Sequence, residues 1–443
     1  MPSKRPRSRL SLGSILVLCL TAMVAVGCVF VFGKIQGQNT EAHMNAQKVI
    51  GLVGNAIQGT TPAPPEATVR TVTVTLAPKK TAAPTESPSP LSSSPLPTGR
   101  PGQRYVFSMT AGGMLGFHSD VSDSVYDAVN KTFDFSPIGS ALKPRIYADL
   151  NLTTLPQLIN TEDLKYADML APVGIAAAIR GMGFDVVVLA TEHILDQGGQ
   201  GAESTVSALK EQKLFAYGVN TAQSQQHHIL SINGARVAIL MYTDVLTAKG
   251  QNELAAQPSL LRTYSAEAAR QDIQAVRDQG AGCVIVCMYW GRADTASPTT
   301  AQKNTARALA EMGADVILGS RPTRVLPVEI IGCVREDGRY HETLVAYSLG
   351  SLLTESRDGY DISGMLLHCN VIIDEYGLVS FQSLEYTPTY IWRQSVNNRL
   401  QYRILCSADP APEGMVADQQ RFLQNALVRI QKTLEASPVT LRK

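Results

Sequence analysis

The chain has 443 residues, enough for two or three domains, and its 39 basic and 38 acidic side chains nearly cancel. The near-cancellation conceals two unlike parts. Residues 1–101 have ten Lys or Arg and three Glu, a net charge of +7, whereas residues 102–443 have 29 Lys or Arg and 35 Asp or Glu, a net charge of −6. Seven cysteines without a CxxC pair exclude a disulfide framework and a cysteine-ligated zinc site, and we expect no nucleic-acid partner.

The N-terminal segment predicts a membrane anchor. Residues 10–33 contain no charged side chain, and as a helix they would span about 36 Å against a hydrocarbon core of about 30 Å. The apolar run continues past every plausible signal-peptide cleavage site, which favours an uncleaved anchor. Segment 1–9 is more basic than the residues just after the helix. The sequence therefore predicts a single-pass protein of the cell membrane with a cytoplasmic N-terminus and an extracellular domain.

Residues 34–101 predict a disordered stalk. Ten of the 24 prolines lie between Pro62 and Pro101, mixed with Thr, Ser and Ala and with few large apolar side chains. Such a composition cannot bury enough apolar surface to offset the entropy lost on ordering. Because proline-rich linkers are semi-rigid, we expect this stalk to hold the following domain away from the membrane.

Residues 102–405 predict a folded domain in which helices and strands alternate. Continuous β-branched runs are typical of strands buried on both faces, and Ser265 is a predicted helix N-cap. Strands are expected at 105–109, 184–190, 235–242, 283–288, 315–318, 328–331, 344–348, 365–373 and 379–386, and helices near 173–182, at 265–279 and from Ser297-Pro298 to Gly313. Gly112-Gly113 is predicted as a turn, four cysteines (Cys283, Cys287, Cys333 and Cys369) as core thiols, and residues 406–443 as a partly helical tail.

This pattern predicts an α/β fold with two mixed β-sheets flanked by helices. In such folds the ligand lies beyond the carboxyl ends of the strands. The sequences at these ends are AGGMLG (111–116), ADLNLT (148–153), FDVVVLATEHILDQG (184–198), MYWG (288–291), GADVILGSRPTR (313–324) and AYSLGSLL (346–353).

In order and spacing these pieces resemble motifs of the CapA (poly-γ-glutamate capsule synthesis, PGA_cap) family, a branch of the calcineurin-like metallophosphatase superfamily. Those motifs are GD-x-M-L-G, x-D-x-x-N-L-E, G-F-D-x-x-x-L-A-N-N-H-x-x-D-x-G, H-W-G, G-A-D-x-V-I-G-H-H-P-H and Y-S-L-G-N-F. The resemblance covers residues 104–405 and implies a metallophosphatase-like layered sandwich.

The ligand positions of that family are mostly substituted. A dinuclear centre needs carboxylates, imidazoles and an Asn that converge on two dications. The resemblance places these ligands on Gly113, Thr153, Glu192, His193, Tyr289, Ser320, Arg321 and Thr323. His193 is the one ligand retained, and an arginine has no acceptor atom and would repel a dication. We therefore expect no metal and no other cofactor.

Two interpretations of the altered cleft stay open. In one, Arg321 and Arg324 hold an anionic ligand such as a phosphate or a carboxylate-rich polymer. The cleft is then lined by Tyr289, Trp290 and His193, although arginines of a surface loop need no such role. In the other, a loop with three polar side chains forms a general acid–base set or a rearranged site for Mn, Fe or Zn, with Asp244 or Asp294 as further candidates. Those three residues are Glu192, His193 and Asp196.

The sequence thus predicts a membrane-anchored, extracytoplasmic pseudoenzyme that acts in capsule or cell-envelope polymer assembly as a binding or scaffolding component. An anionic envelope polymer or capsule-synthesis proteins would be its partners. The alternatives are an active metal-dependent phosphatase or other hydrolase with a rearranged centre, and a sensor or interaction domain that retains only the fold.

Overall fold

The structure is a computed structural model that describes residues 102–160, 169–222, 224, 228–335, 338–396 and 399–442. The predicted anchor (10–33) and stalk (34–101) lie outside the described residues. Within the described ranges, no helix combines the length and the apolar character that a membrane crossing requires.

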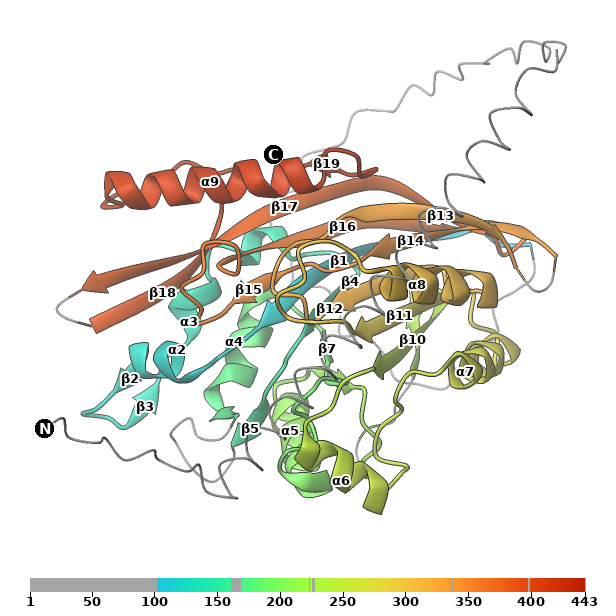
Figure 1. The fold of residues 1–443 in the computed structure, drawn as a ribbon, viewed down its shortest axis with the longest axis horizontal. Helices are drawn as coiled ribbons and strands as arrows, with labels where there is room; N and C mark the ends of the chain where they lie inside the picture. Colours follow the sequence, from blue (N-terminus) through green and yellow to red (C-terminus); the bar gives the residue numbers. More distant parts are fainter. Residues whose placement is uncertain are drawn as a thin grey trace, which may run out of the picture. The chain divides into compact units, whose positions relative to one another are not determined.

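One mixed sheet of the described part has nine strands (Figure 1). Its main path runs β18-β17-β16-β1-β4-β7-β8, with β15 beside β1 and β19 beside β17. The pairs β1–β4, β4–β7 and β7–β8 are parallel, and β16, β17 and β18 are antiparallel. The strands are β1 (Tyr105–Leu115), β4 (Leu150–Thr154), β7 (Val186–Val188), β8 (Phe215–Tyr217), β15 (Ser351–Leu353), β16 (Ser363–Ile373), β17 (Val379–Val396), β18 (Arg399–Cys406) and β19 (Thr440–Leu441).

A second mixed sheet has six described strands in the order β13-β14-β12-β11-β10-β9. Every residue of β10 and β11 is buried, as their continuous apolar runs require. The strands are β9 (His228–Ile232), β10 (Ala235–Thr243), β11 (Cys283–Tyr289), β12 (Val316–Ser320), β13 (Val328–Val334) and β14 (Tyr340–Ala346). Two short ladders pair β2 (Tyr126–Asp127) with β3 (Thr132–Phe133) and β5 (Leu158–Asn160) with β6 (Leu170–Pro172).

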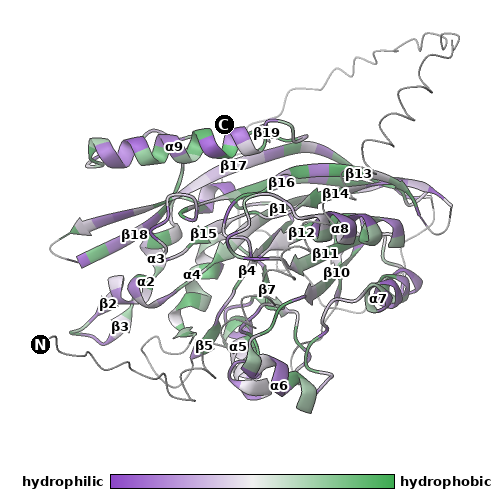
Figure 2. Cartoon of the chain, viewed as in Figure 1, coloured by the Kyte–Doolittle hydropathy of each residue, from purple (hydrophilic) through white to green (hydrophobic). Residues whose placement is uncertain are grey.

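Helices flank these sheets, and α9 runs alongside β17 (Figure 1). One apolar core joins side chains of both sheets, and a second lies between the six-stranded sheet and α7 and α8. Figure 2 shows polar and apolar residues alternating along α9. The helices are α2 (Ser119–Ser124), α3 (Ser136–Gly139), the 3-10 helix η1 (Lys143–Arg145), α4 (Gly174–Met182), α5 (Gly198–Glu211), α6 (Ala248–Ala256), α7 (Ala266–Asp278), α8 (Thr300–Met312) and α9 (Ala417–Thr433).

The predicted class, an α/β fold with several sheets flanked by helices, is confirmed. The Ser265 hydroxyl caps α7 by accepting from the Ala268 amide at 3.1 Å, and Gly313 ends α8 with φ +105°. The four predicted core cysteines are buried. In segment 406–443, α9 packs on β17 and β19 pairs with it, so this segment is part of the folded unit.

Two local predictions were wrong. Gly112 and Gly113 do not form a turn, because β1 continues through them to Leu115. A Cβ on Gly113 would lie 2.3 Å from the Gly350 carbonyl oxygen, so glycine here serves a close approach of two backbones. Helix α8 begins after Thr299, whose hydroxyl accepts from the Gln302 amide in a capping box, and not at Ser297-Pro298.

Candidate functional site

An ion pair joins loops that belong to the two different sheets. Glu192 follows β7 of the nine-stranded sheet, and Arg321 follows β12 of the six-stranded sheet. The Nη2 and Nε atoms of Arg321 lie 3.1 and 3.2 Å from Oε2 of Glu192. The Nη1 atom donates to the carbonyl of Gly291, after β11. One guanidinium group therefore ties together three strand ends.

This pair is largely enclosed, with 17% of the Arg321 side chain and 26% of the Glu192 side chain exposed. Arg321 also has a backbone φ of +90°. Such a conformation costs a non-glycine residue about 1–3 kcal/mol and persists only where the surroundings fix it. The contacts of the guanidinium group with Glu192 and Gly291 supply that constraint.

Tyr289 lies beside this pair, whereas Trp290, which was predicted to line a cleft with it, is a buried core residue. Tyr289 is 6% exposed, and its hydroxyl shares a hydrogen bond with Arg321. Burial, together with the charge of Glu192, raises the pKa of Tyr289, so the phenol stays neutral. Trp290 is 1% exposed, and its Nε1 donates to the Tyr347 carbonyl at 3.0 Å. It is a core residue because its polar atom is satisfied inside the protein.

Of the two further acidic candidates, Asp244 and Asp294, Asp244 lies nearer to Arg321 and Gly291. Its Oδ2 accepts from the Gly291 amide at 3.3 Å. Burial raises the pKa of Asp244, and the Gly291 amide and the charge of Arg321 oppose that rise. Asp294, in contrast, pairs with Arg292 at 3.0 Å on the surface and takes no part in this cluster.

His193 and Asp196 form a dyad in the same loop as Glu192. The Nδ1 of His193 lies 2.7 Å from Oδ2 of Asp196, and the Thr247 hydroxyl donates to Oδ1. Thr247 also donates its amide to the Glu192 carbonyl at 3.3 Å. The three predicted residues Glu192, His193 and Asp196 therefore do lie together, with the imidazole oriented by the carboxylate and the carboxylate by a hydroxyl.

His118 joins this cluster and was missed in the sequence. Burial lowers its pKa, the charge of Glu355 opposes that effect, and His193 lowers the pKa further, so the two histidines are neighbours. His118 comes at the N-cap of α2, just beyond β1. The rule that ligands lie at strand ends would have found it if β1 had been predicted at its full length.

Arg324 points away from the cluster, contrary to the prediction that it shares a cleft with Arg321. Its Nη2 lies 3.7 Å from Asp358 and its Nε 3.8 Å from Asp361, and its guanidinium group lies over the ring of Tyr360. The intervening Thr323 is held by hydrogen bonds of its hydroxyl to Asp361 and to the Ala293 carbonyl. The two arginines therefore belong to separate sites.

The sequence matches the family described as "Bacterial capsule synthesis protein PGA_cap" over residues 108–356, more than half of the chain. The chain belongs to this family. "Capsule biosynthesis protein CapA" of Bacillus anthracis is 26% identical over 266 residues, which cover 57% of this chain and 61% of that protein. "PGA biosynthesis protein CapA" of Bacillus subtilis (strain 168) is 29% identical over 195 residues, 41% of this chain and 46% of that protein. The chain thus spans less than two thirds of the length of these relatives.

Two solved structures are similar to this chain at low identity. NAD nucleotidase (NadN) of Haemophilus influenzae has a TM-score of 0.42 and 13% identity, and the match covers 77% of this chain and 57% of that chain. The calcineurin-like phosphoesterase YfkN of Bacillus subtilis has a TM-score of 0.33 and 12% identity, and the match covers 75% of this chain and 99% of that chain.

The residues of this PGA_cap member do not fit a dinuclear metal centre. The resemblance places one carboxylate on β1, where this chain has glycine, and a second at Thr153 of β4. The Thr153 hydroxyl instead donates to the Gly113 carbonyl at 2.8 Å. Where it places an imidazole, the Arg321 guanidinium group already binds the carboxylate of Glu192. In the described part of the chain, no group of three or more His, Cys, Asp or Glu side chains could hold a metal ion.

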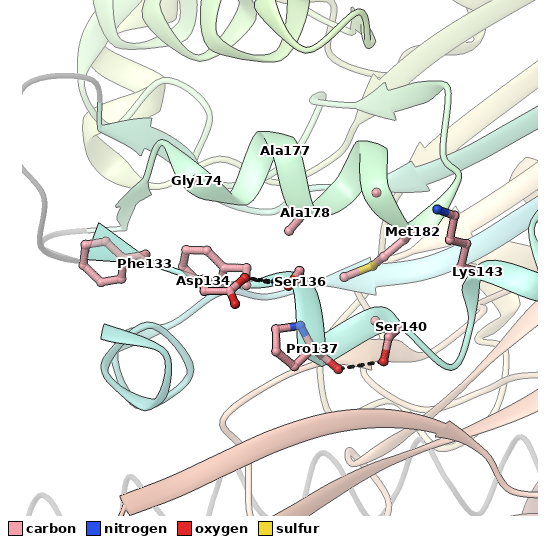
Figure 3. Close-up of a pocket in the computed structure, with 13 residues that line it drawn as sticks. Phe133, Asp134, Ser136, Pro137, Ser140, Lys143, Gly174, Ala177, Ala178 and Met182 are labelled. Atoms are coloured by element: carbon pink, nitrogen blue, oxygen red, sulfur yellow. Dashed lines mark hydrogen bonds between the residues drawn. The ribbon is translucent and has the colours of Figure 1, made fainter. Parts of the chain in front are cut away.

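A cavity of about 530 Å³ lies elsewhere, between α4 and the segment of α3 and η1 (Figure 3). Its walls are mainly apolar, with Phe133, Phe135 and Met182 among the lining residues. The Asp134 carboxylate in its wall accepts from the Ser136 hydroxyl at 2.6 Å. None of the residues predicted for the site lines this cavity.

Proposed function

We propose that this protein acts in the assembly of capsule or another cell-envelope polymer as a metal-free binding or scaffolding component with a metallophosphatase-like layout. The observation that carries the proposal is the ion pair between Arg321 and Glu192. A guanidinium group supplies a fixed positive charge to a carboxylate that would otherwise attract a cation. A dication would have to displace it from Glu192 and from the Gly291 carbonyl.

Family membership supports the link to capsule, since the names of two relatives refer to capsule or PGA biosynthesis. The predicted anchor (10–33) and stalk (34–101) support a position outside the cell, on the membrane surface. Partners would be an anionic envelope polymer or capsule-synthesis proteins that meet the domain there.

The test is the metal content and phosphatase activity of the purified full-length chain. Elemental analysis for Mn, Fe and Zn should find far less than one metal per chain, and phosphomonoesters and phosphodiesters should be hydrolysed no faster than with heat-denatured protein. A stoichiometric metal in the wild-type chain, or turnover above that background, would contradict the proposal.

A second candidate function is hydrolysis by a rearranged centre, and the dyad of His193 and Asp196 favours it. The 2.7 Å contact fixes the imidazole in one orientation, as a general base requires, and Glu192 and His118 lie close by. If this is the function, the wild-type chain should hydrolyse a phosphomonoester or phosphodiester, and His193→Ala should abolish that hydrolysis. An activity that His193→Ala leaves unchanged would exclude it.

A further inference from the structure

Two guanidinium groups apart from the pair of Arg321 and Glu192 lie over one aromatic ring. Arg324 follows β12, and Arg429 lies in the last part of α9. Their Cζ atoms are 4.4 and 5.0 Å from the ring centroid of Tyr360. A cavity of about 570 Å³ is lined by these three side chains and by Lys432, with Val325 and Pro327 among its apolar walls. The fold thus brings three cations from distant parts of the sequence to one pocket.

The two guanidinium groups have more donors than the protein satisfies. Each has five N–H donors in a fixed plane. Arg429 donates to the Gly359 carbonyl, and no described carboxylate forms an ion pair with it. The Nε atoms of Arg324 and Arg429 are both buried, and neither has a hydrogen-bond acceptor among the described residues. The donors left over for a ligand are therefore among the Nη atoms of the two guanidinium groups, since both Nε atoms are enclosed.

The carboxylates near Arg324 compensate its charge only in part. Asp358 and Asp361 lie 3.7 and 3.8 Å from its nitrogen atoms, which is beyond hydrogen-bonding distance. Asp361 instead accepts from the hydroxyls of Thr323 and Ser356, at 2.7 and 3.1 Å. Each of these hydroxyls takes one acceptor site on a different oxygen of Asp361. Arg324 makes ion pairs with Asp358 and Asp361 without a hydrogen bond to either, so its donors can still turn to a ligand.

We propose that this pocket binds a phosphoryl group. A single guanidinium edge saturates a planar carboxylate through a bidentate contact, whereas a tetrahedral phosphoryl group has oxygens enough for two guanidinium groups and an ammonium group. Arg324, Arg429 and Lys432 supply that set, and the apolar walls accommodate the organic part of the ligand. The inference goes beyond the proposed function, because it rests on residues that are separate from the ion pair of Arg321 and Glu192.

The test is the binding of three phosphoryl sources to the purified full-length chain. Equilibrium dialysis measures radiolabelled inorganic phosphate and its displacement by glycerophosphoglycerol, a soluble phosphodiester. Flotation measures binding to phosphatidylcholine vesicles with and without phosphatidylglycerol. Arg429→Gln should weaken phosphate binding about tenfold or more, since a charge-assisted contact is lost. The matched control is Arg421→Gln, on the same helix, where an exposed arginine pairs with Asp418 at 3.1 Å.

Each outcome has a defined meaning. If the phosphodiester displaces phosphate and the protein does not bind vesicles selectively, the site is assigned to a soluble or polymeric phosphate. If the protein binds phosphatidylglycerol vesicles and Arg429→Gln abolishes that binding, the site is assigned to a lipid headgroup. The absence of phosphate and phosphodiester binding, an equal loss in Arg421→Gln, or equally strong displacement by glutamate would overturn the proposal. If Arg429→Gln lowers the melting temperature, Lys432→Gln tests the same pocket from an exposed position. Metal content and turnover do not affect this result.

Discussion

Arg321 and Glu192 meet at 3.1 Å from loops of different sheets, so their ion pair links the two layers of the fold. Removing either partner leaves a partly enclosed charge without compensation. We expect Arg321→Gln and Glu192→Gln each to lower the free energy of unfolding by about 1–3 kcal/mol. Urea unfolding followed by tryptophan fluorescence measures both.

The double variant Glu192→Gln/Arg321→Gln is the control for this prediction. Because each single change already breaks the pair, the double variant should lose less free energy of unfolding than the two single variants lose in sum. The difference, the coupling energy, should be about 0.5–3 kcal/mol. Strictly additive losses would mean that the pair contributes no coupling and that the two side chains act independently.

His368 predicts a pH dependence of stability. It is 3% exposed, and its ring nitrogens lie 3.0 Å from the hydroxyls of Thr110 and Thr387. Burial lowers its pKa to about 3 from the ordinary value of 6.5, and the charges of Arg442 and Arg145 add to the effect. As the pH falls, the unfolded chain binds a proton at His368 before the folded protein does. The contribution of the neutral, buried His368 to the free energy of unfolding is therefore complete above about pH 6.5 and is lost progressively between pH 6.5 and pH 3.

The measurement is the urea midpoint of the wild type and of His368→Gln at several pH values. One histidine accounts for at most about 1.4 kcal/mol per pH unit in this window. Since glutamine does not titrate, the variant should lose less stability between pH 7 and pH 4.5 than the wild type. Parallel curves would show that His368 is not the group responsible.

How much of this fold could be predicted from sequence depended on how local each determinant is. The runs of β10 and β11 identify buried strands because nearly every residue is apolar, with Arg236 and Thr243 as the exceptions in β10. Ser265 caps α7 through a contact within one helical turn. The extent of β1 could not be predicted in this way. The strand continues past Gly113 because the Met114 amide donates to the Gly350 carbonyl at 3.0 Å, and that partner is more than 200 residues away in the sequence.

The same distinction applies to the site. The loop of Glu192, His193 and Asp196 is short, so its clustering could be predicted from sequence. The directions of Trp290 and Arg324 depend on remote groups: the Tyr347 carbonyl accepts from the indole, and Tyr360 lies under the guanidinium group. Residue type and spacing carry no information about such partners, and both side chains were therefore assigned to the wrong surroundings.

Gly113 and Gly181 are a matched pair that tests the close approach of β1. A Cβ on Gly113 would lie 2.3 Å from the Gly350 carbonyl oxygen, a backbone atom that cannot move aside alone, so Gly113→Ala should destabilise by about 2 kcal/mol or more. A Cβ on Gly181, within α4, meets nothing within 4 Å. Gly181→Ala should stabilise by up to about 0.5–1 kcal/mol, the difference between the two residues within a helix, because Gly181 lies in the last turn of α4. Thermal unfolding of both variants measures the contrast, and equal effects would rule out a role for the Gly350 contact.

Thr299 and Ser297 test where α8 begins. Thr299 accepts from the Gln302 amide at 3.2 Å, and the Gln302 side chain accepts from the Thr299 amide at 3.0 Å. Thr299→Ala removes the capping oxygen and should cost about 1 kcal/mol of unfolding free energy. Ser297 lies outside the helix, and Ser297→Ala should change stability by less than about 0.5 kcal/mol. The reverse order of the two effects in urea unfolding would place the N-cap at Ser297, because only the capping hydroxyl satisfies an otherwise unpaired amide of the first turn.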